Sequence, residues 1–524
     1  MSASSDRRKR QDAIFAGVNK KSYAAMEEEK KKRKSKRDWT FGTIVIVLLI
    51  AAILILNSNL FYTGLPAVKV GDVSYNTAQF DYYFKTQYSN FMQQYGQYAS
   101  MFGLDTNQPL KSQKCTMLSD GGTWYDYFKQ QTISNMTQIT ALSEYAKKNN
   151  ITLSKDETAS IDSQLQTIAT QAKDNGYTTK NYLIKLFGRG SSEKLVRGEM
   201  ERYALAAKAY NTTSEGYGTA LTDAELEAYY QKNKNDLDVF DYNFYLVAAE
   251  KVATKDSSTA KATATDATAA PATAVTDETM AAAKKTADGI AAAAKSGKDF
   301  SAAVSAAVDK ATANVQTGIS GSSISGDYAD WLKNASRKAG DITVVKSADT
   351  GYYVVEFVGR GDNHYKMAQA RHILVKAVAG SDGTYTDAAK KTAKEAAQKY
   401  YDEWKKGEAT EASFASMATE YSQDTGSTSK GGLYDSIYKN EMVPEFNDFV
   451  FAPGRKPGDT ALVYGESSNY TGYHVVYYVG LGDLYSSYLA KNAIVNDKMS
   501  TWQEGLTSSL TATPQFSIRF ASVG

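Results

Sequence analysis

The chain carries the same strand ending twice. Residues 350–355 read Thr-Gly-Tyr-Tyr-Val-Val, and residues 471–476 read Thr-Gly-Tyr-His-Val-Val. The similarity continues upstream, where Arg-Lys-Ala-Gly-Asp at 337–341 corresponds to Arg-Lys-Pro-Gly-Asp at 455–459. A module of roughly 110 residues therefore occurs twice in tandem. The two copies should therefore adopt the same fold, and each should have its own hydrophobic core.

The two copies differ in their histidines. His372 and His474 belong to the opening and closing strands of the second copy. The only other histidine of the chain, His364, stands in an expected linker, and we expect it at the surface. The first copy has Phe244 and Tyr353 at the corresponding positions. Only the second copy therefore has an imidazole pair. This difference predicts that the second copy is catalytically active and that the first copy serves as a scaffold.

Length and charge narrow the class of protein. A chain of 524 residues has room for about three or four domains. Beyond residue 62 it has 47 basic and 52 acidic residues, which argues against nucleic-acid binding by the folded part. Cys115 is the only cysteine, so no internal disulfide can form.

The N-terminal region predicts a membrane anchor. A basic run at 30–37 precedes a wholly apolar stretch at 44–56, and the span 41–62 is long enough to cross a hydrocarbon core of ~30 Å. The positive flank places the N-terminus in the cytoplasm and the bulk of the chain outside the cell membrane. A cleaved signal peptide is the competing interpretation. The long front region and the lack of a small-x-small cleavage site favour an uncleaved, single-pass helix.

Residues 63–235 read as mostly helical, after a strand, turn and strand at 68–74. Aromatic residues at spacings of three and four predict one long helix over 80–102, whose stripe lies in the core or in part lines a cradle for unfolded chains. A second helix is expected from Trp124 to about Lys148, and capping boxes at Ser154 and Thr222 predict two later helix starts. The low-complexity segment 252–277 predicts a surface loop. The second copy reads as a strand at 370–376, two helices, a loop at 422–438 and returning strands. We expect an α+β unit with helices on one face of a small sheet.

The second copy resembles a parvulin-type peptidyl-prolyl cis/trans isomerase domain. Pieces of the family's pattern occur in order: an opening strand at 370–375, the segment with a central acidic side chain at 421–427, a Gly-Gly-Leu turn at 431–433, an apolar pocket motif at 442–446 and a last strand at 472–476. The turn departs from the family's Gly-Gly-Asp-Leu-Gly, because its Asp and final Gly are displaced.

The wider layout resembles the exported foldase and chaperone families PrsA and SurA, which place a helical chaperone domain before one or two parvulin domains. The resemblance implies an α+β chain with two tandem parvulin-like domains of small antiparallel sheets and flanking helices. The expected parts are a cytoplasmic tail (1–40), a transmembrane helix (41–62), a helical chaperone-like domain (63–235), a degenerate parvulin-like domain (236–363), a parvulin isomerase domain (364–483) and a C-terminal helix and tail packing on the helical domain (484–524).

The resemblance also implies a site. The expected pocket for the proline ring consists of Leu433, Met442 and Phe446, and the expected polar floor consists of His372, Asp424, Thr471 and His474. Isomerisation of an X-Pro bond needs no nucleophile and no cofactor, because a protein can speed it by binding the twisted amide best. No third strong ligand stands at metal spacing from the histidines, so we expect no metal.

The expected function is that of a peptidyl-prolyl isomerase and chaperone for exported polypeptides with X-Pro bonds. The alternative is a non-catalytic holdase that binds unfolded exported chains through its helical domain. A structural envelope protein is a third hypothesis. The first copy lacks both histidines, so we expect it to be inactive and to serve as a spacer, a client-binding surface or a homodimer contact.

Overall fold

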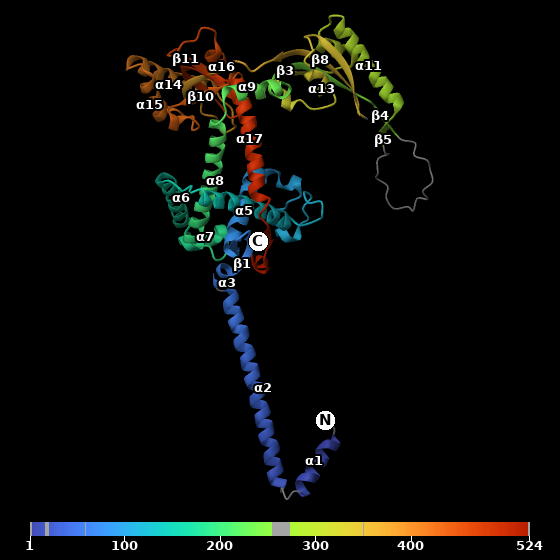
Figure 1. Ribbon diagram of the computed structural model, residues 1–524, viewed down its shortest axis with the longest axis vertical. Helices are drawn as coiled ribbons and strands as arrows, with labels where there is room; N and C mark the ends of the chain where they lie inside the picture. Colours follow the sequence, from blue (N-terminus) through green and yellow to red (C-terminus); the bar gives the residue numbers. More distant parts are fainter. Residues whose placement is uncertain (1–2, 16–19, 58, 254–272, 349, 522–524) are drawn as a thin grey trace. The chain divides into compact units, whose positions relative to one another are not determined.

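The computed structural model describes residues 3–15, 20–57, 59–253, 273–348 and 350–521. It divides into two compact units, one formed by residues 1–216 with 498–524 and the other by residues 217–497 (Figure 1). Helices and small antiparallel sheets make up both units, which confirms the expected mixed class.

The first unit begins with helices α1 (Ala3–Phe15), α2 (Lys20–Asn57) and α3 (Asn59–Gly64). The basic run and the apolar stretch belong to the single helix α2. Among the described residues, the segment Ala25–Leu54 of this helix is the one that is long and apolar enough to cross a membrane.

The first unit also contains a three-stranded sheet of β1 (Pro66–Val70), β2 (Val73–Asn76) and β13 (Ala512–Pro514). The expected strand, turn and strand near residue 70 are β1 and β2. The third strand comes from the far end of the chain, since Val68 pairs with Pro514 and Val70 pairs with Ala512. The C-terminal tail thus completes a sheet that starts more than 400 residues earlier.

The aromatic stripe follows two different helices. Helix α4 (Thr77–Tyr95) starts at a capping box on Asn76 and ends at Tyr95, and a 3-10 helix, η1 (Gly96–Phe102), follows. Phe80 and Phe84 are buried, whereas Tyr98 is 47% exposed. The prediction of one long helix to Phe102 was therefore wrong. A 3-10 helix turns side chains by a different angle per residue, so the stripe does not continue on one face: Tyr98 is exposed, whereas Phe102 packs against the core.

The remaining helices of the first unit begin where their caps predict. Helix α5 runs from Trp124 to Lys148, and α6 begins after the capping box of Ser154 with Glu157. The other helical bounds are α6 (Lys155–Asp174), α7 (Thr179–Phe187), α8 (Glu193–Thr219), and the short 3-10 helices η2 (Leu110–Ser112) and η5 (Phe516–Phe520).

The second unit holds two four-stranded antiparallel sheets with the same layout. The first sheet has the order β6-β3-β8-β7, with β3 (Val239–Ala248), β6 (Asn314–Ser320), β7 (Asp341–Ser347) and β8 (Gly351–Gly361). The second sheet has the order β10-β9-β12-β11, with β9 (Lys366–Lys376), β10 (Leu433–Ile437), β11 (Thr460–Ser467) and β12 (Tyr470–Leu484). Strand β10 lies within the segment expected to be a loop.

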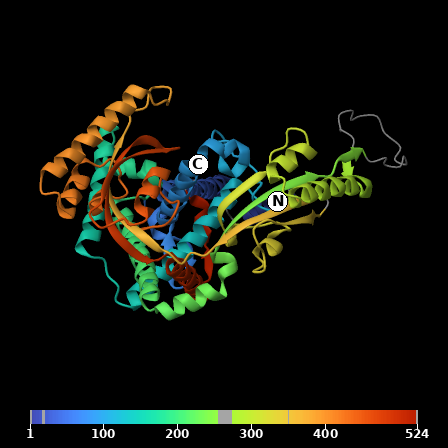
Figure 2. The ribbon, with the colours of Figure 1, turned by 90° about the horizontal axis from the view of Figure 1, so that it is seen from above.

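Helices cover both faces of each sheet. In the second sheet α14 (Asp387–Lys406) and α15 (Glu411–Tyr421) pack on one face, and α16 (Pro444–Phe451) packs on the other. Figure 2 shows α14 and α15 in orange against the strands. The expectation of helices on one face was wrong, because β9 and β12 carry consecutive apolar residues. Successive side chains of a strand point to opposite faces, so both faces are apolar and both are covered. The first sheet repeats this layout with α11 (Asp277–Lys295) and α12 (Phe300–Ala307) opposite α13 (Ala329–Lys333).

Most of the low-complexity segment, residues 254–272, lies outside the described residues. Its two ends pair as strands β4 (Lys251–Ala253) and β5 (Thr273–Val275) instead of forming only a loop. The second unit is completed by the helices α9 (Asp223–Lys232), α10 (Lys234–Leu237), the first part of α17 (Tyr485–Thr507), and the 3-10 helices η3 (Gly321–Ser323) and η4 (Thr428–Lys430).

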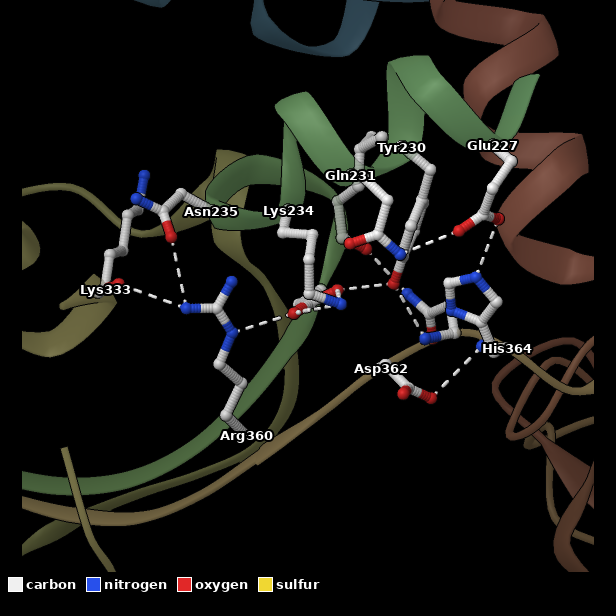
Figure 3. A network of polar contacts seen from close by, with 12 residues as sticks. Glu227, Tyr230, Gln231, Lys234, Asn235, Lys333, Arg360, Asp362 and His364 are labelled. Atoms are coloured by element: carbon white, nitrogen blue, oxygen red, sulfur yellow. Dashed lines mark hydrogen bonds and ion pairs between the residues drawn. The ribbon is translucent and has the colours of Figure 1, made fainter. Parts of the chain in front are cut away.

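A polar network holds the connection between the two sheets (Figure 3). Asp238 is buried, accepts a hydrogen bond from the Tyr230 hydroxyl, and forms an ion pair with Arg360 at 2.7 Å. The backbone N–H of Asn363, in the connecting segment, donates to the same Tyr230 hydroxyl at 2.8 Å. His364 contacts Glu227 at 2.9 Å and its ring packs on Tyr230, so it is partly buried and not a surface residue as expected.

Candidate active site

The two histidines of the second copy face each other across the central strands of the second sheet. His372 on β9 pairs in register with Val476 of β12, and His474 on β12 pairs with Leu374 of β9. Residues two apart on a strand share a face, so both imidazoles project from the face that α16 covers. Both side chains are buried, and their Nδ1 atoms lie 2.9 Å apart.

The histidines belong to one chain of hydrogen bonds. At one end, Nε2 of His372 lies 2.8 Å from a carboxylate oxygen of Asp424, so His372 must donate there. At the other end, Nε2 of His474 lies 2.9 Å from the Tyr470 hydroxyl. With both rings neutral, Tyr470 donates to His474, His474 donates to His372, and His372 donates to Asp424. This single direction of donors satisfies all four ring nitrogens.

Asp424 is fixed by several donors. Besides His372, the hydroxyls of Ser427 and Tyr434 donate to the same carboxylate oxygen, the latter at 3.0 Å. The loop that carries Asp424 is attached to strand β9, because the N–H of Gln423 donates to the carbonyl of Leu374 at 2.9 Å. The carboxylate of Asp424 is therefore held in place at one end of the hydrogen-bonded chain.

Electrostatics set the protonation states of the group. Burial lowers the pKa of His474 to about 3, and the neighbouring His372 acts in the same direction. The hydrogen bond from His372 holds the pKa of Asp424 well below its usual range. Burial, with the charge of Asp424, raises the pKa of Tyr434 to about 12. At neutral pH His474 is therefore uncharged, Asp424 is ionised and Tyr434 keeps its proton.

An apolar wall closes one side of the histidine pair. Phe446 on α16 is 1% exposed, and its ring lies edge-on to His372 at 5.7 Å and to His474 at 5.5 Å between centroids. Met442 packs in the same cluster and is only partly buried. The structure therefore brings the expected Phe446 to the histidines, and the expected Met442 packs in the cluster around it.

Tyr434, and not Leu433, completes this wall. Leu433 pairs with Arg371, and Tyr434 pairs with Ala370. Paired residues share a face, so Tyr434 lies on the histidine side and Leu433 lies on the opposite side. The structure does not place Leu433 in the pocket, because Leu433 follows the Gly-Gly pair directly and lies in register with Arg371. Gly432 fixes that register: its φ is 73°, and a Cβ there would lie 2.4 Å from the carbonyl oxygen of His372.

Thr471 is not part of the hydrogen-bonded group either. It is buried, but it lies three residues from His474 on the same strand, which puts its side chain on the other face. Tyr470 is four residues from His474, on the same face of the strand. It forms the end of the hydrogen-bonded chain, a position expected for Thr471. Sequence reasoning missed Tyr470, Ser427 and Tyr434. Alternation along β12 was a usable signal for Tyr470, while the other two depend on loop conformation.

This arrangement offers groups that can bind an amide. Among the described residues, no three His, Cys, Asp or Glu side chains are grouped so that they could hold a metal ion. The group offers an apolar wall beside a row of fixed donors and acceptors. Such a site suits a substrate that must be held in one conformation without any covalent step.

Residues 357–478 match the family model of the PPIC-type PPIase domain. This part of the chain is therefore a parvulin-type peptidyl-prolyl isomerase domain, as its motifs predicted. The chain is 33% identical over 115 residues to the chaperone SurA of Pseudomonas fluorescens strain Pf0-1, and 32% identical over 114 residues to that of strain Pf-5. These matches cover 21% of this chain and about a quarter, 24%, of the length of each relative.

Two solved structures show the more distant likenesses. PrsA from Bacillus subtilis is 14% identical, with 75% of this chain and 88% of that chain covered and a TM-score of 0.27. A peptidylprolyl isomerase (PrsA) from Bacillus anthracis is 22% identical, with 31% and 63% covered and a TM-score of 0.17.

Proposed function

We propose that this protein is a peptidyl-prolyl isomerase and chaperone that helps exported polypeptides to fold. The proposal rests on the hydrogen-bonded chain that runs from Asp424 through the two histidines to Tyr470. The ring of Phe446 packs against both imidazoles. These residues lie inside a PPIC-type domain.

The reaction is rotation about an X-Pro amide, against a barrier of about 20 kcal/mol. Twisting the amide breaks its resonance, which leaves a lone pair on the proline nitrogen and a less polar carbonyl. An apolar wall of Met442, Phe446 and Tyr434 would hold the pyrrolidine ring away from water and disfavour the more polar planar amide. The substrate carbonyl would lie over the polar floor. No proton needs to be transferred, so we assign His372 and His474 the role of a rigid floor.

The first sheet supports a second part of the proposal, that residues 236–363 form a degenerate parvulin-like domain. Phe244 pairs with Val355 as His372 pairs with Val476, and Tyr353 pairs with Leu246 as His474 pairs with Leu374. The ring of Tyr328, just before α13, packs on both Phe244 and Tyr353, at 5.6 and 5.0 Å between centroids. Aromatic side chains therefore fill the place of the histidines and the pocket, and we propose that this domain has no isomerase activity.

Client binding would involve the first unit as well. Tyr95, Tyr98 and Met101 at the end of α4 and in η1 are large apolar side chains that are 38%, 47% and 80% exposed. Exposed aromatic and methionine side chains suit transient contact with unfolded chains. The apolar segment of α2, with its basic run, supports a single-pass anchor whose N-terminus is cytoplasmic and whose other residues act outside the membrane.

The test is isomerisation of short peptides by the full chain in detergent micelles. The cis-to-trans rate of an X-Pro tetrapeptide should rise above the spontaneous rate with wild type and fall towards it with Met442→Ala or Asp424→Ala. Tyr353→Ala, in the first sheet, is the matched control and should keep the wild-type rate. A wild-type rate no higher than the spontaneous one would contradict the enzymatic proposal.

A further inference from the structure

A separate cavity in the first unit has the features of a ligand site. It has a volume of about 500 Å³ and lies between the end of α5, the segment that follows it, and α8. This volume is in the range of pockets that hold small ligands or a few residues of a peptide. It involves none of the isomerase residues.

One wall of the cavity is a single stripe of α8. Gly198, Glu201, Arg202 and Leu205 recur at helical spacing and all line it. The glycine leaves room, because a Cβ on Gly198 would have no heavy atom within 4 Å. This wall therefore offers open space at Gly198, an apolar side chain at Leu205 and a guanidinium at Arg202.

Arg202 is the anchored cation of this wall. Its Nε donates to the buried carboxylate of Glu199 at 3.2 Å, and its guanidinium lies over the ring of Tyr75. The same carboxylate accepts hydrogen bonds from Gln79 and Tyr83. Among the described residues, the Nη atoms of Arg202 have no partner, and neither is a buried unsatisfied atom. Arg202 lines the cavity, so its guanidinium is a donor group anchored by Glu199 at the cavity wall.

The opposite wall offers apolar side chains and unused backbone groups. After α5 the chain turns at Asn150, whose φ is 57°, and continues without helix or strand through Ile151, Thr152 and Leu153. Ile151 and Leu153 line the cavity. No hydrogen bond among the described residues uses the backbone N–H or C=O of Thr152 or Leu153. An extended backbone with free polar groups can pair with another extended chain.

We propose that this cavity binds the C-terminal end of an extended polypeptide whose last residues are apolar. The α-carboxylate would accept hydrogen bonds from Arg202, and the last side chain would pack on Ile151, Leu153 and Leu205. Lys147 also lines the cavity, but its ammonium is paired with Glu144 at 2.7 Å, so Arg202 is the main cation of the site. Glu201 repels a second negative charge, so a single carboxylate fits better than a phosphate. The free backbone groups at Thr152 and Leu153 favour a peptide over a simple fatty acid.

The first experiment compares two peptides on the full chain in detergent micelles. A fluorescein-labelled hexapeptide ending in Leu-Leu is titrated with a free carboxylate and as the carboxamide, and binding is followed by anisotropy. The carboxylate form should bind about tenfold more tightly, because it alone makes charge-assisted hydrogen bonds to the guanidinium. Equal affinities, or no binding of the acid, would overturn the proposal. Displacement by hexanoate as effective as that by unlabelled peptide would show that the site does not recognise a peptide.

The second experiment fills the cavity without disturbing the ion pair. Gly198→Met should abolish binding of the acid peptide, whereas Gly216→Met, on the same helix and also with open space at its Cβ, should leave binding unchanged. Both variants should keep wild-type isomerase rates on short X-Pro peptides, which shows that the chain is folded and that this site is separate from the isomerase centre. Unchanged binding by Gly198→Met would refute the assignment to this cavity.

Discussion

The two sheets of the second unit are the same framework filled in two different ways. Phe244 and Tyr353 occupy the register positions that His372 and His474 occupy in the second sheet. In the first sheet the aromatic ring of Tyr328 packs on both of them. In the second sheet Asp424 and Tyr470 close the ends of a hydrogen-bonded chain. Strand order therefore does not decide what a site can do; the side chains on one face do.

The difference has an energetic reason. A buried imidazole is costly unless both of its nitrogens have partners, so a histidine pair requires polar residues at both ends. Aromatic rings have no such requirement and stabilise the core by burial alone. The stability of the second sheet thus depends on several specific hydrogen bonds, whereas the stability of the first depends mainly on how well aromatic side chains fill its core.

The largest expected effect comes from the buried ring that touches both histidines. Phe446→Ala should lower the unfolding free energy of its domain by about 3–5 kcal/mol, because a fully buried ring is lost. It should also abolish isomerase activity. Leu332→Ala, a fully buried site on the corresponding helix of the first sheet, should cost about 2–5 kcal/mol and leave activity intact. Urea denaturation with peptide kinetics checks both. Loss of activity in the Leu332 variant, while it stays folded, would contradict the division of roles.

The two sheets should also respond differently to acid. His474 has an ordinary pKa of 6.5 when unfolded and about 3 when folded, so below pH 6.5 the unfolded state binds the extra proton. Stability of the second sheet should therefore fall by about 2 kcal/mol from pH 7 to pH 5. The lowered pKa of Asp424 adds a loss only at more acidic pH. Hydrogen exchange, corrected for intrinsic rates, measures both sheets in one sample. An equal fall in the first sheet would argue against His474 as the cause.

A histidine placed in the first sheet should not restore a site. Tyr353→His puts an imidazole beside Phe244 and Tyr328, where aromatic rings surround it. The change should destabilise the domain by about 1–3 kcal/mol, because a polar group is buried without adequate partners. Isomerase activity should not change. Thermal unfolding and peptide kinetics test this, and a gain of activity would show that one imidazole is enough.

The smallest expected effect concerns the end of the hydrogen-bonded chain. Tyr470→Phe removes the donor to Nε2 of His474 and should cost about 1 kcal/mol of stability. It should also change the nitrogen chemical shifts of both imidazoles, because nothing then fixes their tautomers. Thr471→Val is the control, since this side chain lies on the other face of the strand. Shifts that move in the Thr471 variant and not in the Tyr470 variant would reverse the assignment.

Much of the local structure could be predicted from the residues. Helix α5 begins and ends where expected, and the caps at Ser154 and Thr222 are both formed. The strands β10 and β13 were not predicted, because each is short and pairs with only one neighbour. Such short strands form because they pair with a neighbouring strand, and their sequences show little alternation that would predict them.

The candidate site divides in the same way. Motif order predicted His372, His474, Asp424, Met442 and Phe446. In the structure His372 contacts His474, Asp424 and Phe446, and Met442 packs against the apolar cluster that contains Phe446. The structure does not bring Leu433 or Thr471 to them. Both errors are shifts of one residue, and on a strand a shift of one residue exchanges the two faces.

The sequence by itself determined that one module occurs twice, that only one copy has an imidazole pair, and that residues 44–56 form an apolar stretch behind a basic run. These properties reside in residue identity and order, which no packing can alter. The tertiary structure decided which tyrosines reach the histidines, which ring fills the first sheet, and where the C-terminal strand pairs. Those outcomes depend on register and on contacts between distant segments, and they are fixed only when the chain has folded.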